Sequence, residues 1–305
     1  MLVRTFASAV TGIDAVTVTV EVNVSQGIRF FLVGLPDSAV KESQQRIESA
    51  FRSLGFHWPG KQVVINMAPA DIRKEGSSYD LPLAVGILAA DERVIKGEIE
   101  SYVIMGELSL DGTLQPVKGI LPIALRAREE KFKGVIVPSK NAREAAVVKG
   151  LDAYGLDTLG DVVDFLNGTR KFDPVRINLD DIFTGEANKY DVDFSDVRGQ
   201  ENVKRALEVA AAGHHNLLMI GPPGSGKTML AKRLSTIMPP LTLEEALETT
   251  KIHSVAGKID DHNPLMTRRP FRSPHHTISE EIVSNEGVWL FFFANSFWYS
   301  DFATL

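Results

Sequence analysis

Alternating apolar and polar positions dominate the first part of the chain. Valines occupy every second position from Val16 to Val24, with polar residues between them. The turn residues Ser25-Gln26-Gly27 then lead into the apolar run IRFFLVGLP (28–36). Side chains two positions apart lie on the same face of a strand. The pattern predicts a β-hairpin over residues 13–34 with one buried face.

The following segments change between helical and strand-like periods. A helix is predicted after the capping residue Asp37, because Val40, Ile47, Phe51 and Leu54 then form one apolar stripe. Further predicted elements are a strand over 61–69, an apolar helix over 81–90, and a second hairpin over 106–117 that turns at Asp111-Gly112. Helical and strand-like segments alternate up to about residue 167. This order predicts an α/β domain over residues 1–167.

A change of composition separates this domain from a second one. Residues 168–192 are polar and charged without a sustained period, which predicts a linker with a short apolar anchor at Ile182-Phe183. A second α/β domain is predicted over 193–305, with a helix over 200–212, the strand NLLMIG (216–221), a glycine-rich loop and a helix over 227–238.

Composition and charge remove several classes of function. The 305 residues carry a formal net charge of -6, which argues against nonspecific DNA binding by bulk charge. The absence of cysteine excludes disulfides, thiolate metal sites and cysteine nucleophiles. The first residues, MLVRTFASAVTG, lack a sustained apolar run, and we find no segment of the roughly 20 apolar residues that a membrane helix needs. A cytoplasmic protein without membrane contact is expected.

The motif GPPGSGKT (221–228) is the strongest chemical signal in the chain. It matches the P-loop pattern and lies between an apolar strand and a helix, as that motif requires. Glycines let backbone N–H groups and the helix N-terminus face a phosphate group. Lys227 is expected to reach the terminal phosphates, and Thr228 to offer its hydroxyl to Mg²⁺. The predicted ligands are ATP and Mg²⁺, held by Gly221, Pro222, Pro223, Gly224, Ser225, Gly226, Lys227 and Thr228.

The segment before the P-loop resembles the entry pattern of AAA+ ATPases. In that pattern a VxGQ-like loop and its helix cover the adenine. The resemblance implies that Val197, Gly199 and Gln200 lie near the base of the nucleotide. A simple capped helix start is the alternative interpretation.

Longer segments resemble the ComM/YifB family of magnesium-chelatase-like AAA+ ATPases. RRPFRSPHHTIS (268–279) resembles the signature that follows the P-loop in that family. FLVGLPDSAVKES, VVINMAPADIRKEGSSYDLPLAVGILAA and GELSLDGTLQPVKGILPIA resemble its N-terminal Lon-protease-like domain, so the match covers about residues 1–280. The resemblance implies a homohexameric motor on single-stranded or branched DNA, which drives branch migration of recombination intermediates during natural transformation.

One departure from the family concerns protease chemistry. The segment KEGSSYD places Ser78 where Lon proteases hold their nucleophile. Serine–lysine catalysis needs a nearby amine to accept the hydroxyl proton. Where Lon carries that lysine, this chain has Leu121-Pro122-Ile123, and Lys118 is expected on the wrong side of the hairpin register. The domain is therefore expected to be non-proteolytic.

A second departure concerns ATP hydrolysis. The family's apolar strand ends in Asp-Glu, which hold Mg²⁺ and orient the attacking water. In SNEGVWLFFFANSFWYSDFATL (284–305), alignment on Gly287-Val288 places Phe292-Phe293 at the acidic pair, and only Asp301 could replace it. Residues 288–305 resemble a frameshifted or truncated end. We therefore expect no intact catalytic residue, impaired hydrolysis and exposure of the aromatic tail from Trp289 onward.

The remaining candidates are histidine pairs and a basic stretch. Neighbouring residues on a strand point to opposite faces, so neither His214-His215 nor His275-His276 predicts a metal site. Arg268, Arg269, Arg272, Lys251 and Lys258 form either a solvated or inter-subunit face or a contact with DNA phosphates. Two other functions stay open. One is a magnesium-chelatase-like ATPase subunit, and the other is a non-hydrolysing nucleotide-binding protein or remnant.

Overall fold

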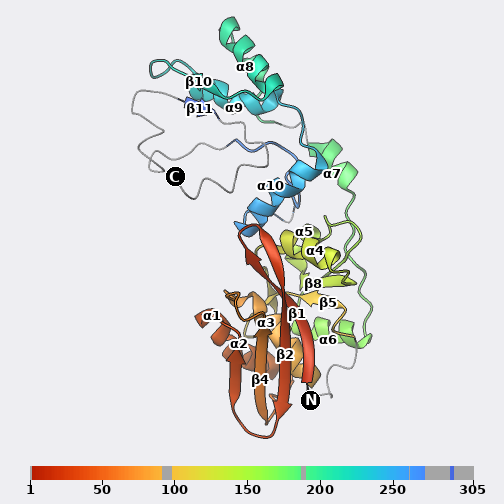
Figure 1. The fold of residues 1–305 in the computed structure, drawn as a ribbon. Helices are drawn as coiled ribbons and strands as arrows, with labels where there is room; N and C mark the ends of the chain where they lie inside the picture. Colours follow the sequence, from red (N-terminus) through yellow and green to blue (C-terminus); the bar gives the residue numbers. More distant parts are fainter. Residues whose placement is uncertain (1, 91–97, 187–189, 261, 272–288, 292–305) are drawn as a thin grey trace. The chain divides into compact units, whose positions relative to one another are not determined.

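The chain folds into two compact units. The computed structural model describes residues 2–90, 98–186, 190–260, 262–271 and 289–291. The first unit consists of Met1–Ile177 with Thr249–Leu265, and the second of Asn178–Glu248 with Met266–Leu305 (Figure 1). The domain boundaries at 167 and 193 and the linker over 168–192 stay predictions. The α/β class of the first unit is confirmed by its mixed sheet and packed helices.

A seven-stranded sheet forms the centre of the first unit, in the order β3-β4-β2-β1-β5-β8-β9. Parallel pairs join β3 to β4 and run from β1 through β5 and β8 to β9, whereas β1–β2 and β2–β4 are antiparallel. The strands are β1 (Leu2–Thr11), β2 (Asp14–Ser25), β3 (Phe30–Val33), β4 (Gln62–Ala68), β5 (Tyr102–Ile104), β8 (Gly134–Pro138) and β9 (Asp152–Leu156).

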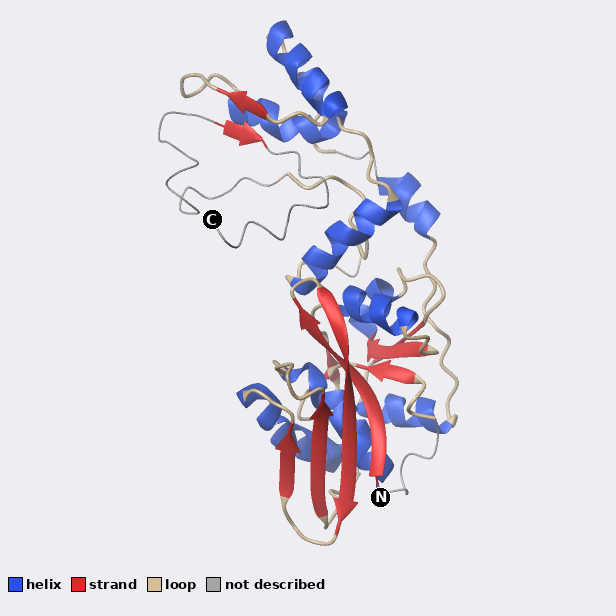
Figure 2. Cartoon of the chain, in the orientation of Figure 1, coloured by secondary structure: helices blue, strands red, loops and turns tan. Residues whose placement is uncertain are grey.

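The predicted hairpin over residues 13–34 is wrong in its pairing. The valines of β2 do bury one face, since Val18, Val20 and Val22 are fully buried. The partner of β2, however, is the preceding strand β1, which it joins across Gly12-Ile13. The other edge of β2 pairs with β4, so β4 separates β2 from β3 (Figure 2). Strand β4 therefore occupies the edge of β2 at which the predicted turn at 25–27 would have placed β3.

The helices of the first unit mostly follow the sequence pattern. The Asp37 carboxylate accepts a hydrogen bond from the Val40 N–H at 2.8 Å, which confirms the predicted cap. The predicted helix is divided at Glu42 into α1 (Ser38–Lys41) and α2 (Ser43–Ser53). The apolar α3 (Asp80–Ala90) is buried along its whole length and packs on β1 and β2. The second predicted hairpin is present as β6 (Glu107–Leu108) and β7 (Leu114–Gln115). The other elements are the 3₁₀ turn η1 (Ser77–Tyr79) and helices α4 (Ile120–Glu129), α5 (Ser139–Ala145) and α6 (Leu159–Asn167).

The second unit is organised around a short strand and the helix that follows it. Its described elements are α7 (Leu179–Glu186), η2 (Phe194–Asp196), α8 (Glu201–Gly213), β10 (Leu217–Met219), α9 (Lys227–Ile237), the first part of α10 (Leu243–Val255) and β11 (Trp289–Phe291). Apolar side chains of η2, α8, β10 and α9 form one buried cluster. Strand β10 pairs antiparallel with β11. Within the described parts of both units, no helix combines the length and apolar character needed to cross a membrane.

Candidate nucleotide-binding site

The P-loop motif forms the connection between β10 and α9, as the sequence predicts. Gly224 and Gly226 have φ angles of 81° and 86°, in the left-handed region where a side chain is strained. Glycine therefore suits both positions, and the loop can turn tightly before α9 begins at Lys227. No side chain caps the N-terminus of this helix. Its first N–H groups are the kind of donors that bind anions.

Lys227 folds back over the loop that precedes it. Its ammonium donates to the carbonyls of Gly221 at 2.5 Å and Pro222 at 2.8 Å, and lies 3.3 Å from the Ser225 hydroxyl. These partners are neutral, and no ion pair to a carboxylate is formed by Lys227 among the residues that the structure describes. Among the described residues, its positive charge is thus held at the loop by neutral oxygen atoms alone. Thr228, the predicted magnesium ligand, is exposed at the start of the helix.

The entry segment lies against the P-loop. Gln200 has a left-handed backbone, with φ 55°, and its side-chain amide lies 3.4 Å from the Ser225 carbonyl. Gly199 precedes it with φ 68° and is exposed. Val197 is 2% exposed, and its side chain belongs to the buried cluster that includes Leu230 of α9. Of the three residues predicted to contact the base, two are accessible to a ligand, namely Gly199 and Gln200. The side chain of the third, Val197, is part of the buried apolar cluster.

An arginine that sequence reasoning did not single out connects this entry segment to α9. Arg233 bonds the Asp193 carbonyl at 3.0 Å and the Asp196 carboxylate at 3.1 Å. Asp193 in turn caps η2 by accepting from the Ser195 N–H at 2.7 Å. The only available signal was the position of Arg233 on the predicted helix after the P-loop, which does not distinguish it from an ordinary surface arginine.

Comparison with known proteins identifies the family. One family model, described as subunit ChlI of Mg-chelatase, matches residues 20–141, and another, described as magnesium chelatase, subunit ChlI, matches residues 193–287. Competence protein ComM from Haemophilus influenzae is 42% identical over 285 residues, which cover 93% of this chain and 55% of ComM. The chain belongs to the ComM/YifB family. YifB from Salmonella typhimurium is 43% identical over 272 residues, which cover 89% of this chain and 52% of YifB.

The same comparisons support the Lon-like character of the front of this family. Lon protease 2 from Bacillus subtilis is 29% identical over 131 residues, which cover 42% of this chain and 23% of the protease. Together with the mixed sheet of the first unit, this similarity confirms the predicted fold class. The chain spans about half the length of the curated ComM and YifB relatives that it matches.

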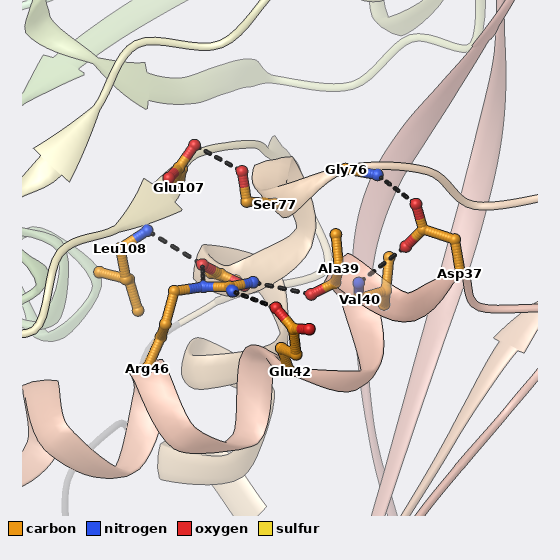
Figure 3. A network of polar contacts seen from close by, with 10 residues as sticks. Asp37, Ala39, Val40, Glu42, Arg46, Gly76, Ser77, Glu107 and Leu108 are labelled. Carbon is orange, nitrogen blue, oxygen red and sulfur yellow. Dashed lines mark hydrogen bonds and ion pairs between the residues drawn. The ribbon is translucent and has the colours of Figure 1, made fainter.

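In this ComM/YifB-type chain Ser77, the residue before Ser78, belongs to a network of polar contacts (Figure 3). The Ser78 carbonyl accepts from the Gly106 N–H at 3.0 Å. The neighbouring Ser77 hydroxyl donates to the Glu107 carboxylate at 2.5 Å. In the same network, the Arg46 guanidinium forms an ion pair with the buried carboxylate of Asp80. The network joins the 3₁₀ turn η1 to α2 and β6, which gives this loop a structural role.

Leu121, where the resemblance to Lon proteases predicts the catalytic lysine to be missing, is a buried apolar residue. Leu121 is fully buried at the start of α4. Its N–H donates to the Glu144 carboxylate at 3.0 Å and lies 3.4 Å from the Ser254 hydroxyl. Burial raises the pKa of Glu144, while the hydrogen bonds from Ser254 and from the Leu121 N–H oppose that shift. The Lys118 side chain lies close to Gly257 and lines a pocket of about 370 Å³ with Glu144 and Ser254.

The basic stretch and the histidines are divided between different environments. Arg269 pairs with Glu245 at 3.2 Å, and Lys251 pairs with Asp14 at 2.9 Å. The Arg268 guanidinium lies 5.9 Å from the centre of the Tyr190 ring. His214 adopts a left-handed backbone at the end of α8, and the described ranges contain no cluster of three or more potential metal-binding side chains. Arg272, His275, His276, the PHHTIS signature, Phe292-Phe293 and Asp301 lie outside the described residues.

Proposed function

We propose that the second unit binds ATP with Mg²⁺ at the loop between β10 and α9. The observation that carries this proposal is the position of Lys227, whose ammonium rests on loop carbonyls without a carboxylate partner among the described residues. Backbone N–H groups of the loop and of the first turn of α9 would surround the β- and γ-phosphates. Lys227 would leave the carbonyls and contact the terminal phosphates.

The remaining site residues have distinct proposed roles. The exposed Thr228 hydroxyl would be a ligand of Mg²⁺ bound to the phosphates. Gly199 and Gln200 would contact the adenine, and buried Val197 would support their turn from below. Gly221, Pro222, Pro223, Gly224, Ser225 and Gly226 would shape the loop around the phosphates.

Thermal unfolding with and without ligand tests this proposal. A ligand that binds only the folded state at one hundred times its Kd stabilises it by about 2.7 kcal/mol. ATP with Mg²⁺ is therefore expected to raise the melting temperature by several degrees. Adenosine serves as the control, because it lacks the phosphates that the P-loop recognises. An equal shift with adenosine, or no shift with ATP, contradicts the proposal.

We further propose that the family's activity is ATP-driven remodelling of DNA by a ring of subunits. The similarity to competence protein ComM supports this proposal. For this chain we propose slow ATP hydrolysis, because it has Phe292-Phe293 at the position where the resemblance to the family predicts the Asp-Glu pair. Without these carboxylates, neither the water shell of Mg²⁺ nor the attacking water is positioned.

Steady-state phosphate release tests the proposal of slow hydrolysis. The assay compares this chain, with and without branched DNA, against a full-length YifB relative. We expect turnover near background, and an increase when Phe292→Asp and Phe293→Glu are combined. DNA-stimulated turnover of the unaltered chain at the relative's rate contradicts impaired hydrolysis.

A magnesium-chelatase-like ATPase subunit is the second candidate function. It is favoured by the two family models, which both carry the description of that subunit. The Lon-like front and the identity to ComM favour DNA remodelling instead. Stimulation of turnover by branched DNA, measured in the variant with the acidic pair, would separate the two.

A further inference from the structure

Arg233 connects two parts of the second unit that are far apart in sequence. It lies on α9, six positions after Lys227. One edge of its guanidinium donates to the Asp193 carbonyl at 3.0 Å, and another nitrogen meets the Asp196 carboxylate at 3.1 Å. The planar arginine group can satisfy two acceptors at once, which a lysine ammonium does with less directionality.

The burial of this pair is unequal. The Arg233 side chain is 16% exposed and the Asp196 side chain is 51% exposed. The pKa of Asp196 is lowered, first by the hydrogen bond with the Asp193 N–H and then by that from Arg233. The carboxylate is therefore charged at neutral pH, and the ion pair is present under ordinary conditions.

A second contact holds the other end of the same turn. Gln200 places its amide 3.4 Å from the Ser225 carbonyl inside the P-loop. Between the two contacts lie only residues 197–199, including exposed Gly199. The turn is thus attached to α9 at Asp196 and to the phosphate loop at Ser225. Both attachments therefore belong to the continuous segment formed by the P-loop and α9.

We propose that Arg233 is a positioning residue, which fixes the turn 197–200 so that it can contact the base of a nucleotide whose phosphates occupy the P-loop. This inference rests on the proposed ATP site. It assigns base recognition to a geometry set by α9, because the Arg233 guanidinium binds Asp193 and Asp196 of the entry segment. Loss of Arg233 should weaken recognition of the base and leave phosphate binding intact.

Isothermal titration with two probes tests this role. ATP reports on base and phosphates together, and inorganic tripolyphosphate reports on phosphates alone, both with Mg²⁺. Arg233→Met is expected to weaken ATP binding roughly tenfold, the size expected when one charge-assisted hydrogen bond is lost, with tripolyphosphate affinity unchanged. Arg233→Lys should recover part of the loss, because it keeps the charge facing Asp196. Arg205→Met is the control, since Arg205 is 75% exposed and pairs with Glu208 on α8.

The outcomes separate this inference from the proposed function. If Arg233→Met weakens the binding of ATP and of tripolyphosphate equally, Arg233 stabilises the whole second unit. If ATP binding is unchanged, Arg233 does not position the turn that contacts the base. Either result overturns the proposal. Equal affinity of the unaltered chain for ATP and tripolyphosphate also overturns it, while the P-loop assignment survives. Binding of neither probe to the unaltered chain refutes the P-loop site itself. Asp196→Asn removes the same ion pair from its exposed side, so the test remains decisive if Arg233→Met does not fold.

Discussion

The Arg46 guanidinium binds the buried carboxylate of Asp80 through two of its nitrogens. Nε lies 2.6 Å from Oδ2 and Nη2 lies 2.8 Å from Oδ1. The Asp80 side chain is 1% exposed, and its Oδ2 also accepts from the Leu108 N–H at 3.3 Å. Burial raises the pKa of the Asp80 carboxyl, and the Arg46 guanidinium opposes that shift. The pair therefore joins α2, α3 and β6 beside the loop that holds Ser78.

Removal of Arg46 should destabilise the first unit strongly. Arg46→Met leaves the buried Asp80 carboxylate without its partner, and such losses cost roughly 3–5 kcal/mol. Arg52→Met is the matched control, because its pair with Glu48 is exposed and should cost less than about 0.5 kcal/mol. Urea unfolding followed by circular dichroism measures both. Similar midpoints for the two variants would show that the Arg46 pair adds nothing to stability.

The buried Glu144 should make stability depend on pH. Burial raises the pKa of Glu144 in the folded chain above the unfolded value of about 4.3. At a pH between these two pKa values, Glu144 keeps its proton in the folded chain and has lost it in the unfolded chain. The contribution of Glu144 to the free energy of unfolding is therefore fully present below about pH 4.3, and it is lost as the pH rises through the folded pKa.

Glu144→Gln removes this titration while keeping a similar shape. We expect the free energy of unfolding of the variant to fall less between pH 4 and 7 than that of the unaltered chain. Glu129→Gln, on the exposed surface of α4, serves as control. Parallel pH profiles for all three proteins would mean that Glu144 ionises in the folded state as it does in the unfolded chain.

The first unit should lack peptidase activity. The resemblance to Lon proteases predicts the activating lysine at Leu121, which is fully buried and carries no amine for the Ser78 hydroxyl. Casein cleavage with ATP should stay at background in both the unaltered chain and Ser78→Ala. Cleavage by the unaltered chain that disappears in the variant would demonstrate an active serine.

Locally determined features could be predicted from the sequence. The Asp37 cap depends on an N–H three residues away, and the P-loop depends on glycines beside their own strand and helix. The buried face of β2 follows from its alternation alone. In each case the residues that decide the structure are close in the chain.

Features that depend on distant partners could not be predicted in this way. Strand β3 pairs with β4 across the whole α1–α2 segment, so no local turn signals its place. The Ser254 hydroxyl meets Glu144, 110 positions away, and residues 249–265 join the first unit although they follow the P-loop. Val197 resembles a base contact in its motif, yet its side chain is buried by the apolar cluster of α8 and α9.

Binding of a fluorescent ATP analogue to Lys227→Ala tests the central claim most directly. The control is Lys232→Ala, which removes an exposed lysine from the same helix α9. If ATP occupies the P-loop, the unaltered chain and Lys232→Ala should bind the analogue alike, and Lys227→Ala should lose binding. Equal binding by Lys227→Ala would place the nucleotide elsewhere and contradict the account.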